Sequence, residues 1–338
     1  MELKIKKIND YDLSSWNNLI SKLEGPLHNC TWNNLEYYSS YNGIKNTTFA
    51  IFYENKLVAV FPFAKSSKKK NKFSFGNNSV FAPLFIPSIK SSHKKRIYNE
   101  VFQMIKKKFK LKKLQVNVEV SPVYFKNNKS HILSKNQFYL LEFSKKYVVH
   151  NLLVVDLKKE ENQLLKDMSK YHRKNINKTS KIKDLKFKVL NHKNSQREIE
   201  KKLYELKKYH RISAGKVTRP LKTWKVMLKK IYDNEADLFF LDLNDKTISY
   251  LYCSRWLDFA WGWTQVNLKK YEYMSPRHFL EWSVMKYYKN NQFSFYELGE
   301  RYFMQDRFKP TKKELSISEF KEKFGSDRYP KGYFQLEV

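Results

Sequence analysis

One order of expected elements occurs twice along this chain of 338 residues, and that repeat limits the fold more than any other feature. In each copy two β-rich runs form a hairpin, a third run follows, and a helix then leads to a last strand. The first copy comprises 46–53, 56–63, 73–75, a helix from Ser91 and 114–120. The second comprises 236–243, 247–254, 257–264, a helix from Ser275 and Pro276, and 293–298. Self-similarity at half the chain length predicts two copies of one α/β unit.

Short local signals mark the turns and the helix starts. Glu54 with Asn55, and Asn244 with Asp245, separate paired β-rich runs and predict tight hairpin turns. Pro276 suits the first position of a helix, where its missing N–H costs no hydrogen bond. Each copy is also preceded by amphipathic helices, whose apolar faces are expected to pack on a core.

The predicted fold class is α/β (α+β), with two domains that are each a mixed twisted sheet flanked by helices. We expect an N-terminal domain over 1–145 and a C-terminal domain over 146–314. The segment 315–338 is expected to return and pack on the first domain. Residues 147–157 read as the first strand of the second domain, and 160–182 read as one helix.

The charge balance favours polyanionic partners. Lys and Arg total 66 against 33 Asp and Glu, which gives a formal net charge of +33. An excess of this size attracts tRNA, phosphate-bearing precursors and anionic membrane surfaces. Most of the basic residues are lysine, so a solvated exterior without a focused binding surface stays open as an alternative.

The apolar and cysteine patterns point to a cytoplasmic protein. No stretch approaches the roughly 20 apolar residues of a membrane-spanning helix, and the start MELKIKKIND lacks the apolar core of a signal peptide. Cys30 and Cys253 are too far apart for a zinc ligand cluster and too few for a disulfide framework. We expect the protein to be free in the cytoplasm or peripheral at the inner face of the membrane.

Five segments, taken in order, carry a family resemblance. They are 28–38 (HNCTWNNLEYY), 209–220 (YHRISAGKVTRP), 275–282 (SPRHFLEW), 296–300 (YELGE) and 317–325 (ISEFKEKFG). The last is similar to the FK-x-x-FG segment near the end of many FemAB-like acyltransferases. Over almost its whole length the chain resembles the Fem-type peptidyltransferase branch of the GNAT acyltransferase superfamily.

The resemblance implies where an acyl donor binds. In that superfamily two adjacent parallel strands splay apart and the donor enters the wedge, which here would lie between 257–264 and 293–298. The segment 269–275 (KKYEYMS) lacks the glycines of the usual coenzyme A pyrophosphate loop. The turn after Trp32 carries Leu35 and Glu36 where peptidyltransferases have a phosphate-binding lysine. The donor therefore stays open between an acyl-coenzyme A thioester and an aminoacyl-tRNA.

The resemblance and the residue types together give the expected site. Lys321 matches the late lysine of the family and would stabilise the oxyanion or bind a phosphate. Glu297 and Glu300, at the end of the last strand, would accept the proton of the acceptor amine. Substrate or co-substrate contacts are expected from Arg173, Arg219, Trp261, Trp263, Pro276, Arg277 and His278. Cys253 has no neighbouring activator, and no residues show metal-ligand spacing.

The expected function is N-acyl transfer from an acyl-coenzyme A donor to an amine of a cell-envelope saccharide or peptide precursor. No permanently bound cofactor is expected. A tRNA-dependent peptidyltransferase acting on a peptidoglycan precursor is the alternative within the enzyme class. A non-catalytic protein that binds RNA or an anionic membrane is the alternative from another class, and it would show salt-sensitive binding without turnover.

Overall fold

The computed structural model places six segments of the chain. It describes residues 3–23, 28–66, 73–75, 79–120, 139–306 and 309–337. The chain divides into two compact units, Met1–His150 together with Pro330–Val338, and Asn151–Tyr329. Each unit has its own apolar core, so each is described by itself.

The first unit contains a small antiparallel sheet. Its strands run in the order β1 (Leu3–Lys7), β3 (Phe49–Tyr53), β4 (Lys56–Phe61) and β7 (Leu84–Phe85). Glu54 and Asn55 connect β3 and β4 with φ angles of 48° and 59°, so the predicted hairpin is confirmed.

The other strands and the helices of this unit complete its core. β8 (Gln115–Val120) pairs antiparallel with β15 (Asp327–Glu337) and parallel with β6 (Val80–Phe81), while β2 (Ile44–Asn46) pairs with β5 (Ala64–Ser66). The strand predicted over 73–75 is wrong, since Phe73 makes only a single bridge, to Lys65. The helices of the unit are α1 (Leu13–Ser21), α2 (Trp32–Asn42), α3 (Ser91–Lys108) and α4 (Tyr139–Glu142).

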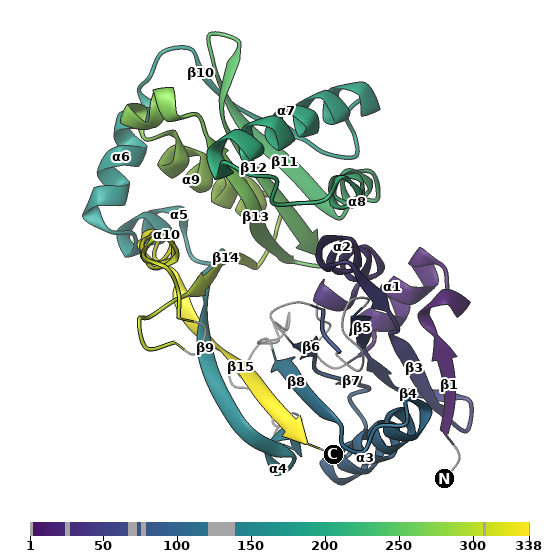
Figure 1. The fold of residues 1–338 in the computed structure, drawn as a ribbon. Helices are drawn as coiled ribbons and strands as arrows, with labels where there is room; N and C mark the ends of the chain where they lie inside the picture. The colour runs from purple at the N-terminus through teal and green to yellow at the C-terminus, as the bar shows by residue number, and fades with distance from the viewer. Residues whose placement is uncertain are drawn as a thin grey trace. The chain divides into compact units, whose positions relative to one another are not determined.

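The second unit is a twisted sheet with helices on both faces (Figure 1). Its strands run in the order β10 (Leu185–Leu190), β11 (Ala236–Leu243), β12 (Lys246–Trp256), β13 (Phe259–Asn267), β14 (Phe295–Arg301) and β9 (Ser144–Asp156). Neighbours are antiparallel except β13 and β14, which are parallel. The helices are α5 (Glu161–Asp167), α6 (Lys170–Ser180), α7 (Gln196–Ala214), α8 (Leu221–Tyr232), α9 (Pro276–Asn290) and α10 (Lys312–Glu322), with a 3-10 turn, η4 (Lys269–Met274).

Alternation along β12 assigns the helices to opposite faces of this sheet. The Tyr250 hydroxyl donates to Glu205 of α7, and the Tyr252 hydroxyl donates to the Met227 carbonyl of α8. Leu251 and Cys253, the intervening residues, belong to the core cluster that contains the apolar side chains of α9. The faces of the sheet are therefore covered by α7 with α8, and by α9.

The helix predicted over 160–182 is two helices. Met168 has an extended backbone and ends α5, and the side chain of Ser169 then accepts from the His172 N–H as the N-cap of α6. The Arg173 guanidinium donates to the carbonyls of Lys166, at 2.9 Å, and of Met168. These bonds satisfy the end of α5, so the chain can turn without leaving carbonyls unpaired.

Candidate active site

The two parallel strands of the second unit separate partway along their length. Phe259 to Trp261 pair with Phe295 to Glu297, and the ladder between these fully described strands ends there. Beyond Trp261, β13 continues to pair with β12, whereas β14 continues beside β9 with a bulge between Glu297 and Gly299. The structure therefore has the opening that the family resemblance implied.

A cavity of about 490 Å³ lies against the open part of β13. The strand contributes residues 262–267, and the first turns of α9 contribute Arg277 and Glu281. The remaining walls come from α10, the end of α7 and single residues of β12, β14 and η4. These residues are His210, Ser213, Ala214, Leu251, Glu272, Leu298, Lys313, Ile317 and Lys321.

Lys321 reaches this cavity from α10. Gly299, at a φ of +113°, leaves room for it, because a Cβ added there would lie 2.9 Å from the Lys321 Nζ. Burial, with the nearby charge of Arg277, holds the pKa of Lys321 below its ordinary value, while Glu281 and then Glu297 and Glu300 oppose that fall. The carboxylates thus favour a positive charge that burial alone would disfavour.

Glu281 is a buried carboxylate on the same cavity, with only 6% of its surface exposed. Burial raises its pKa, and a hydrogen bond from Tyr296 with the charge of Arg277 opposes the rise. The Tyr296 hydroxyl donates to Glu281 Oε1 at 2.6 Å. A Cβ added at Gly262 would lie 3.0 Å from that hydroxyl, so the glycine leaves the space that the tyrosine fills. The cavity therefore holds a cation and a proton-accepting carboxylate of raised pKa.

The segment FKEKFG at 320–325 positions the lysine through packing on both sides. The Phe320 ring contacts the Arg277 guanidinium, whose centre lies 3.8 Å from the ring centroid, and Phe324 is 1% exposed in the core. Gly325 has a φ of +78°, and a Cβ there would lie 2.8 Å from backbone and side-chain carbons of Asp167. Packing therefore accounts for Phe320, Phe324 and Gly325 in this segment, whatever reaction the site performs.

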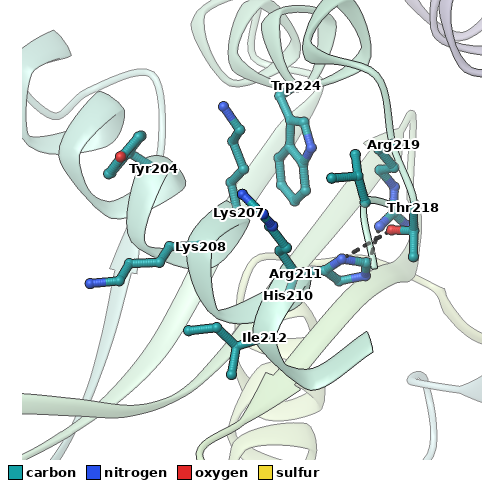
Figure 2. A pocket seen from close by; sticks show the side chains of 10 residues that line it. Tyr204, Lys207, Lys208, His210, Arg211, Ile212, Thr218, Arg219 and Trp224 are labelled. Atoms are coloured by element: carbon teal, nitrogen blue, oxygen red, sulfur yellow. Dashed lines mark hydrogen bonds between the residues drawn. The ribbon is translucent and has the colours of Figure 1, made fainter. Parts of the chain in front are cut away.

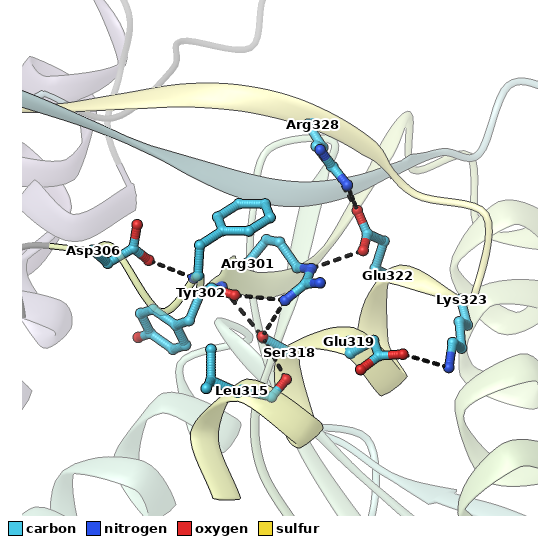
Figure 3. Close-up of polar contacts among 10 residues, drawn as sticks. Arg301, Tyr302, Asp306, Leu315, Ser318, Glu319, Glu322, Lys323 and Arg328 are labelled. Carbon is cyan, nitrogen blue, oxygen red and sulfur yellow. Dashed lines mark hydrogen bonds and ion pairs between the residues drawn. The ribbon is translucent and has the colours of Figure 1, made fainter. Parts of the chain in front are cut away.

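Polar contacts fix α10 to the end of β14 (Figure 3). The Arg301 Nε donates to Glu322 at 2.7 Å, and Arg328 pairs with the other oxygen of the same carboxylate. The Ser318 hydroxyl accepts from the Tyr302 N–H and from Arg301, each at 3.2 Å. Since Ser318 is 1% exposed, these bonds hold the helix one turn before Lys321.

A second cavity, of about 520 Å³, lies between α7 and the start of α8 (Figure 2). His210 lines both cavities. Arg219 donates to His210 Nε2 at 2.9 Å and lies 5.7 Å from the ring centroid of Trp224. Burial and then Arg219 lower the pKa of His210 to about 4, so this imidazole is neutral near pH 7 and accepts from the guanidinium.

Some of the predicted site residues line one of the two cavities, and the others lie elsewhere in the structure. Lys321, Arg277 and Trp263 line the first cavity, and Arg219 lines the second. Trp261 is 2% exposed and packs against Trp263 at 6.0 Å between centroids. Among the described residues, neither cavity is lined by the remaining predicted ones, which are Arg173, Pro276, His278, Glu297 and Glu300.

These remaining residues have other described contacts. Arg173 donates to carbonyls at the end of α5, as given above. His278 is 7% exposed and lies 4.7 Å from His172 and 4.9 Å from Phe320, measured between ring centroids. Pro276 is buried at the first position of α9. Glu297 and Glu300 are on β14, where their negative charges raise the pKa of Lys321.

The sequence did not identify Glu281, Gln265 or His210 as site residues, or Tyr296 as the hydrogen-bond donor to Glu281. Gln265 accepts from the Arg277 Nε at 2.9 Å and so ties α9 to β13. Tyr296 stands within the YELGE segment of the resemblance, yet only the fold brings it to Glu281, fifteen positions away. A charged residue amid apolar neighbours of an expected helix, as in 279–285, is the one signal that marks Glu281.

The environment of Cys253 and the grouping of possible metal ligands bear on two of the sequence expectations. Cys253 is buried, and burial raises the pKa of its thiol, which keeps it from acting as a thiolate. Within the described residues, no group of three or more His, Cys, Asp or Glu side chains is placed to hold a metal ion.

Comparison with solved structures identifies the fold. FemX aligns with a TM-score of 0.67 at 12% identity, over 99% of this chain and 98% of that one. The C-terminal domain of a putative lysylphosphatidylglycerol synthetase from Agrobacterium fabrum aligns at 0.60 and 11% identity, over 97% and 92%. A tandem GNAT protein from the clavulanic acid biosynthesis pathway aligns at 0.55 and 10% identity, over 100% and 98%.

The predicted fold class is therefore confirmed: the chain has a tandem GNAT fold, which it shares with FemX. The sequence itself matches no protein-family model and no curated protein. Among the described helices, none combines the length and apolar character needed to cross a bilayer.

Proposed function

We propose that the protein is an acyltransferase or aminoacyltransferase whose transfer site is the cavity beside the open edge of β13. The observation that carries the proposal is the placement of Lys321 and Glu281 on that cavity, where the two groups act on each other's pKa. A cation for the oxyanion and a base for the amine proton are the two groups that acyl transfer to an amine requires.

In the proposed reaction the acceptor nitrogen attacks the carbonyl carbon of the donor. The Lys321 ammonium stabilises the negative charge that forms on the carbonyl oxygen. Glu281 takes the proton that the attacking nitrogen loses, and its raised pKa suits that role near neutral pH. The bond from carbon to the leaving sulfur or oxygen then breaks, and the leaving group takes up a proton. Glu297 and Glu300 favour the charged form of Lys321, against the burial that lowers its pKa.

The proposed donor is an acyl-coenzyme A thioester, with aminoacyl-tRNA as the alternative. The segment before α9 forms η4, in which Tyr271 N donates to Leu268 O and Ser275 N donates to Glu272 O. These two amides are therefore occupied, so the phosphates of a coenzyme A donor would have to bind other groups. The net charge of +33 favours a large polyanionic donor, which keeps the tRNA alternative in the proposal.

The proposed acceptor is an amine of a cell-envelope saccharide or peptide precursor that carries a phosphate. Arg219 supports this part of the proposal, because its guanidinium faces the second cavity and His210 joins that cavity to the first. The hydrogen bond to the neutral His210 ring and the contact with the Trp224 ring fix the orientation of the Arg219 guanidinium, which can then bind a phosphate. A peripheral position at the inner face of the membrane is part of the same proposal.

The test is discharge of labelled donors. Purified protein is incubated separately with acetyl-coenzyme A, longer acyl thioesters and aminoacyl-tRNA, each with amine-bearing wall precursors, and acyl transfer is measured. Lys321→Met should lower the rate by about a hundredfold or more. Glu281→Gln should lower it by a similar factor and remove the acidic limb of the pH profile.

Lys323→Met is the matched control, because Lys323 lies two residues from Lys321 and pairs with Glu319 at the surface. It should keep the wild-type rate. A Lys321→Met variant as active as the wild type would refute the catalytic assignment. Salt-sensitive binding of tRNA or lipid without turnover of any donor would favour the non-catalytic alternative.

A further inference from the structure

The mouth of the second cavity combines exposed apolar side chains with cations. We define this α7–α8 rim as Tyr204, Lys207, Lys208, Arg211, Ile212 and Val217, all of which line the cavity (Figure 2). Tyr204, Ile212 and Val217 are 66%, 64% and 68% exposed. Two of these apolar residues belong to α7 and the third to the loop that follows it.

These exposed side chains do not pack in the core of the unit. The core-facing residues of α7 are Ile199, Leu203 and Leu206, which are at most 5% exposed. Tyr204 and Ile212 lie off this stripe, so the helix is apolar on a second part of its surface. Single exposed apolar side chains are ordinary, but three around one cavity form a patch that indicates an interaction surface.

The charge of the α7–α8 rim selects an anionic partner. Lys207, Lys208 and Arg211 are interleaved with the apolar residues, and the described residues that line the cavity include no carboxylate. Glu205, the nearest acidic residue in the sequence, is held by Lys202 at 2.9 Å and by the Tyr250 hydroxyl. Lys207 also lies 5.7 Å from the ring centroid of Tyr204, as snorkelling lysines beside interfacial aromatics do.

We propose that the α7–α8 rim docks on an anionic lipid bilayer, with Ile212 and Val217 inserted among the acyl chains and the cations on lipid phosphates. Aliphatic side chains gain from acyl chains but have no flat face on which nucleic-acid bases stack, which favours a bilayer over RNA. The proposal does not depend on acyl transfer, since binding is measured without a donor.

Vesicle sedimentation tests the docking. One set of vesicles is phosphatidylcholine, and the other is an equal mixture of phosphatidylcholine and phosphatidylglycerol. The full-length protein should bind the mixed vesicles, bind the neutral ones weakly, and release as salt is raised. The double variant Lys207→Gln with Lys208→Gln should weaken partition about thirtyfold, since each cation near a charged bilayer contributes about fivefold. Ile212→Ser with Val217→Ser should weaken it by about a hundredfold or more, because two inserted aliphatic side chains are lost.

The control variants make the same types of change elsewhere on the protein. Met304→Ser removes an apolar side chain that is 78% exposed, and Lys183→Gln with Lys186→Gln removes two exposed lysines. Both should partition as the wild type does, and circular dichroism should show all variants folded. Absence of binding to mixed vesicles overturns the proposal. An apolar double variant with wild-type partition also overturns it, and binding of tRNA lost only in the lysine variant would identify an RNA surface instead.

Discussion

Replacing Gly325 with alanine tests whether close packing at the end of α10 holds Lys321 in place. At this glycine φ is +78°, and an added Cβ would lie 2.8 Å from the carbonyl carbon and the Cβ of Asp167 and 3.0 Å from its oxygen. Ordinary contacts between carbon atoms lie near 3.5–4.0 Å, so the two segments must move apart by about 0.7 Å or more.

The expected loss has two parts that a second glycine separates. An alanine with positive φ costs about 1–2 kcal/mol, and its smaller unfolded-state entropy returns about 0.4–1 kcal/mol. Gly215→Ala measures this net cost alone, because φ there is +67° and nothing lies within 4 Å of the added Cβ. At Gly325 overpacking adds about 1–3 kcal/mol to the same backbone cost. We therefore expect Gly325→Ala to lose about 2 kcal/mol more than Gly215→Ala.

Urea unfolding followed by tryptophan fluorescence measures both losses, since all seven tryptophans are available as probes and Trp224, Trp261 and Trp263 lie in the second unit. The difference should appear in the transition of that unit. Equal losses in the two variants would refute the reasoning, because they would mean that Asp167 moves aside at no cost and that Gly325 does not fix α10.

Three further predictions concern the cavity and its supports. Gly299→Ala should be less stable than Gly215→Ala, because its φ of +113° lies outside the left-handed region that an alanine can adopt, and acyl discharge in a single turnover should fall by about tenfold or more because the new Cβ displaces the Lys321 Nζ; a wild-type rate would contradict this. Tyr296→Phe should lower the free energy of unfolding by about 1–3 kcal/mol, measured in urea, because buried Glu281 loses its donor; an unchanged value would count against that bond. Burial and Arg277 lower the pKa of His278 from 6.5 to about 4. The unfolded chain therefore takes up the proton first, and stability falls as the pH drops from 6.5 to 4; His278→Phe should flatten this pH dependence in urea series, and superimposable curves would disprove it.

The sequence was sufficient where structure depends on neighbouring residues. The hairpin turns are an example, because Asn244 and Asp245 adopt φ angles of 46° and 61°, conformations that these residue types tolerate. Pro276 begins α9 as predicted, because its fixed φ suits the first helical position. The order of strands and helices also follows from local patterns, and its repetition along the chain predicted two copies of one unit.

Local patterns were insufficient where an element ends for tertiary reasons. The single helix predicted over 160–182 breaks at Ser169. The carbonyls freed at the break accept from Arg173, and the Ser169 N–H donates to the Lys323 carbonyl just after α10. The spacing of apolar residues is helical on both sides of Ser169, so this spacing does not predict the break.

The family resemblance, together with residue type, predicted that Lys321 and a carboxylate would share a site, since the acyl transfer that the resemblance implies needs a cation and a base. Which carboxylates line the cavity was decided by the tertiary structure. Glu297 and Glu300 lie on the last strand and do not line the cavity, whereas Glu281 of α9 and Glu272 of η4 do. The physical reason is that burial, the Tyr296 hydroxyl and Lys321 act on the Glu281 carboxylate from three separate elements, and distances between elements are set only when the chain packs.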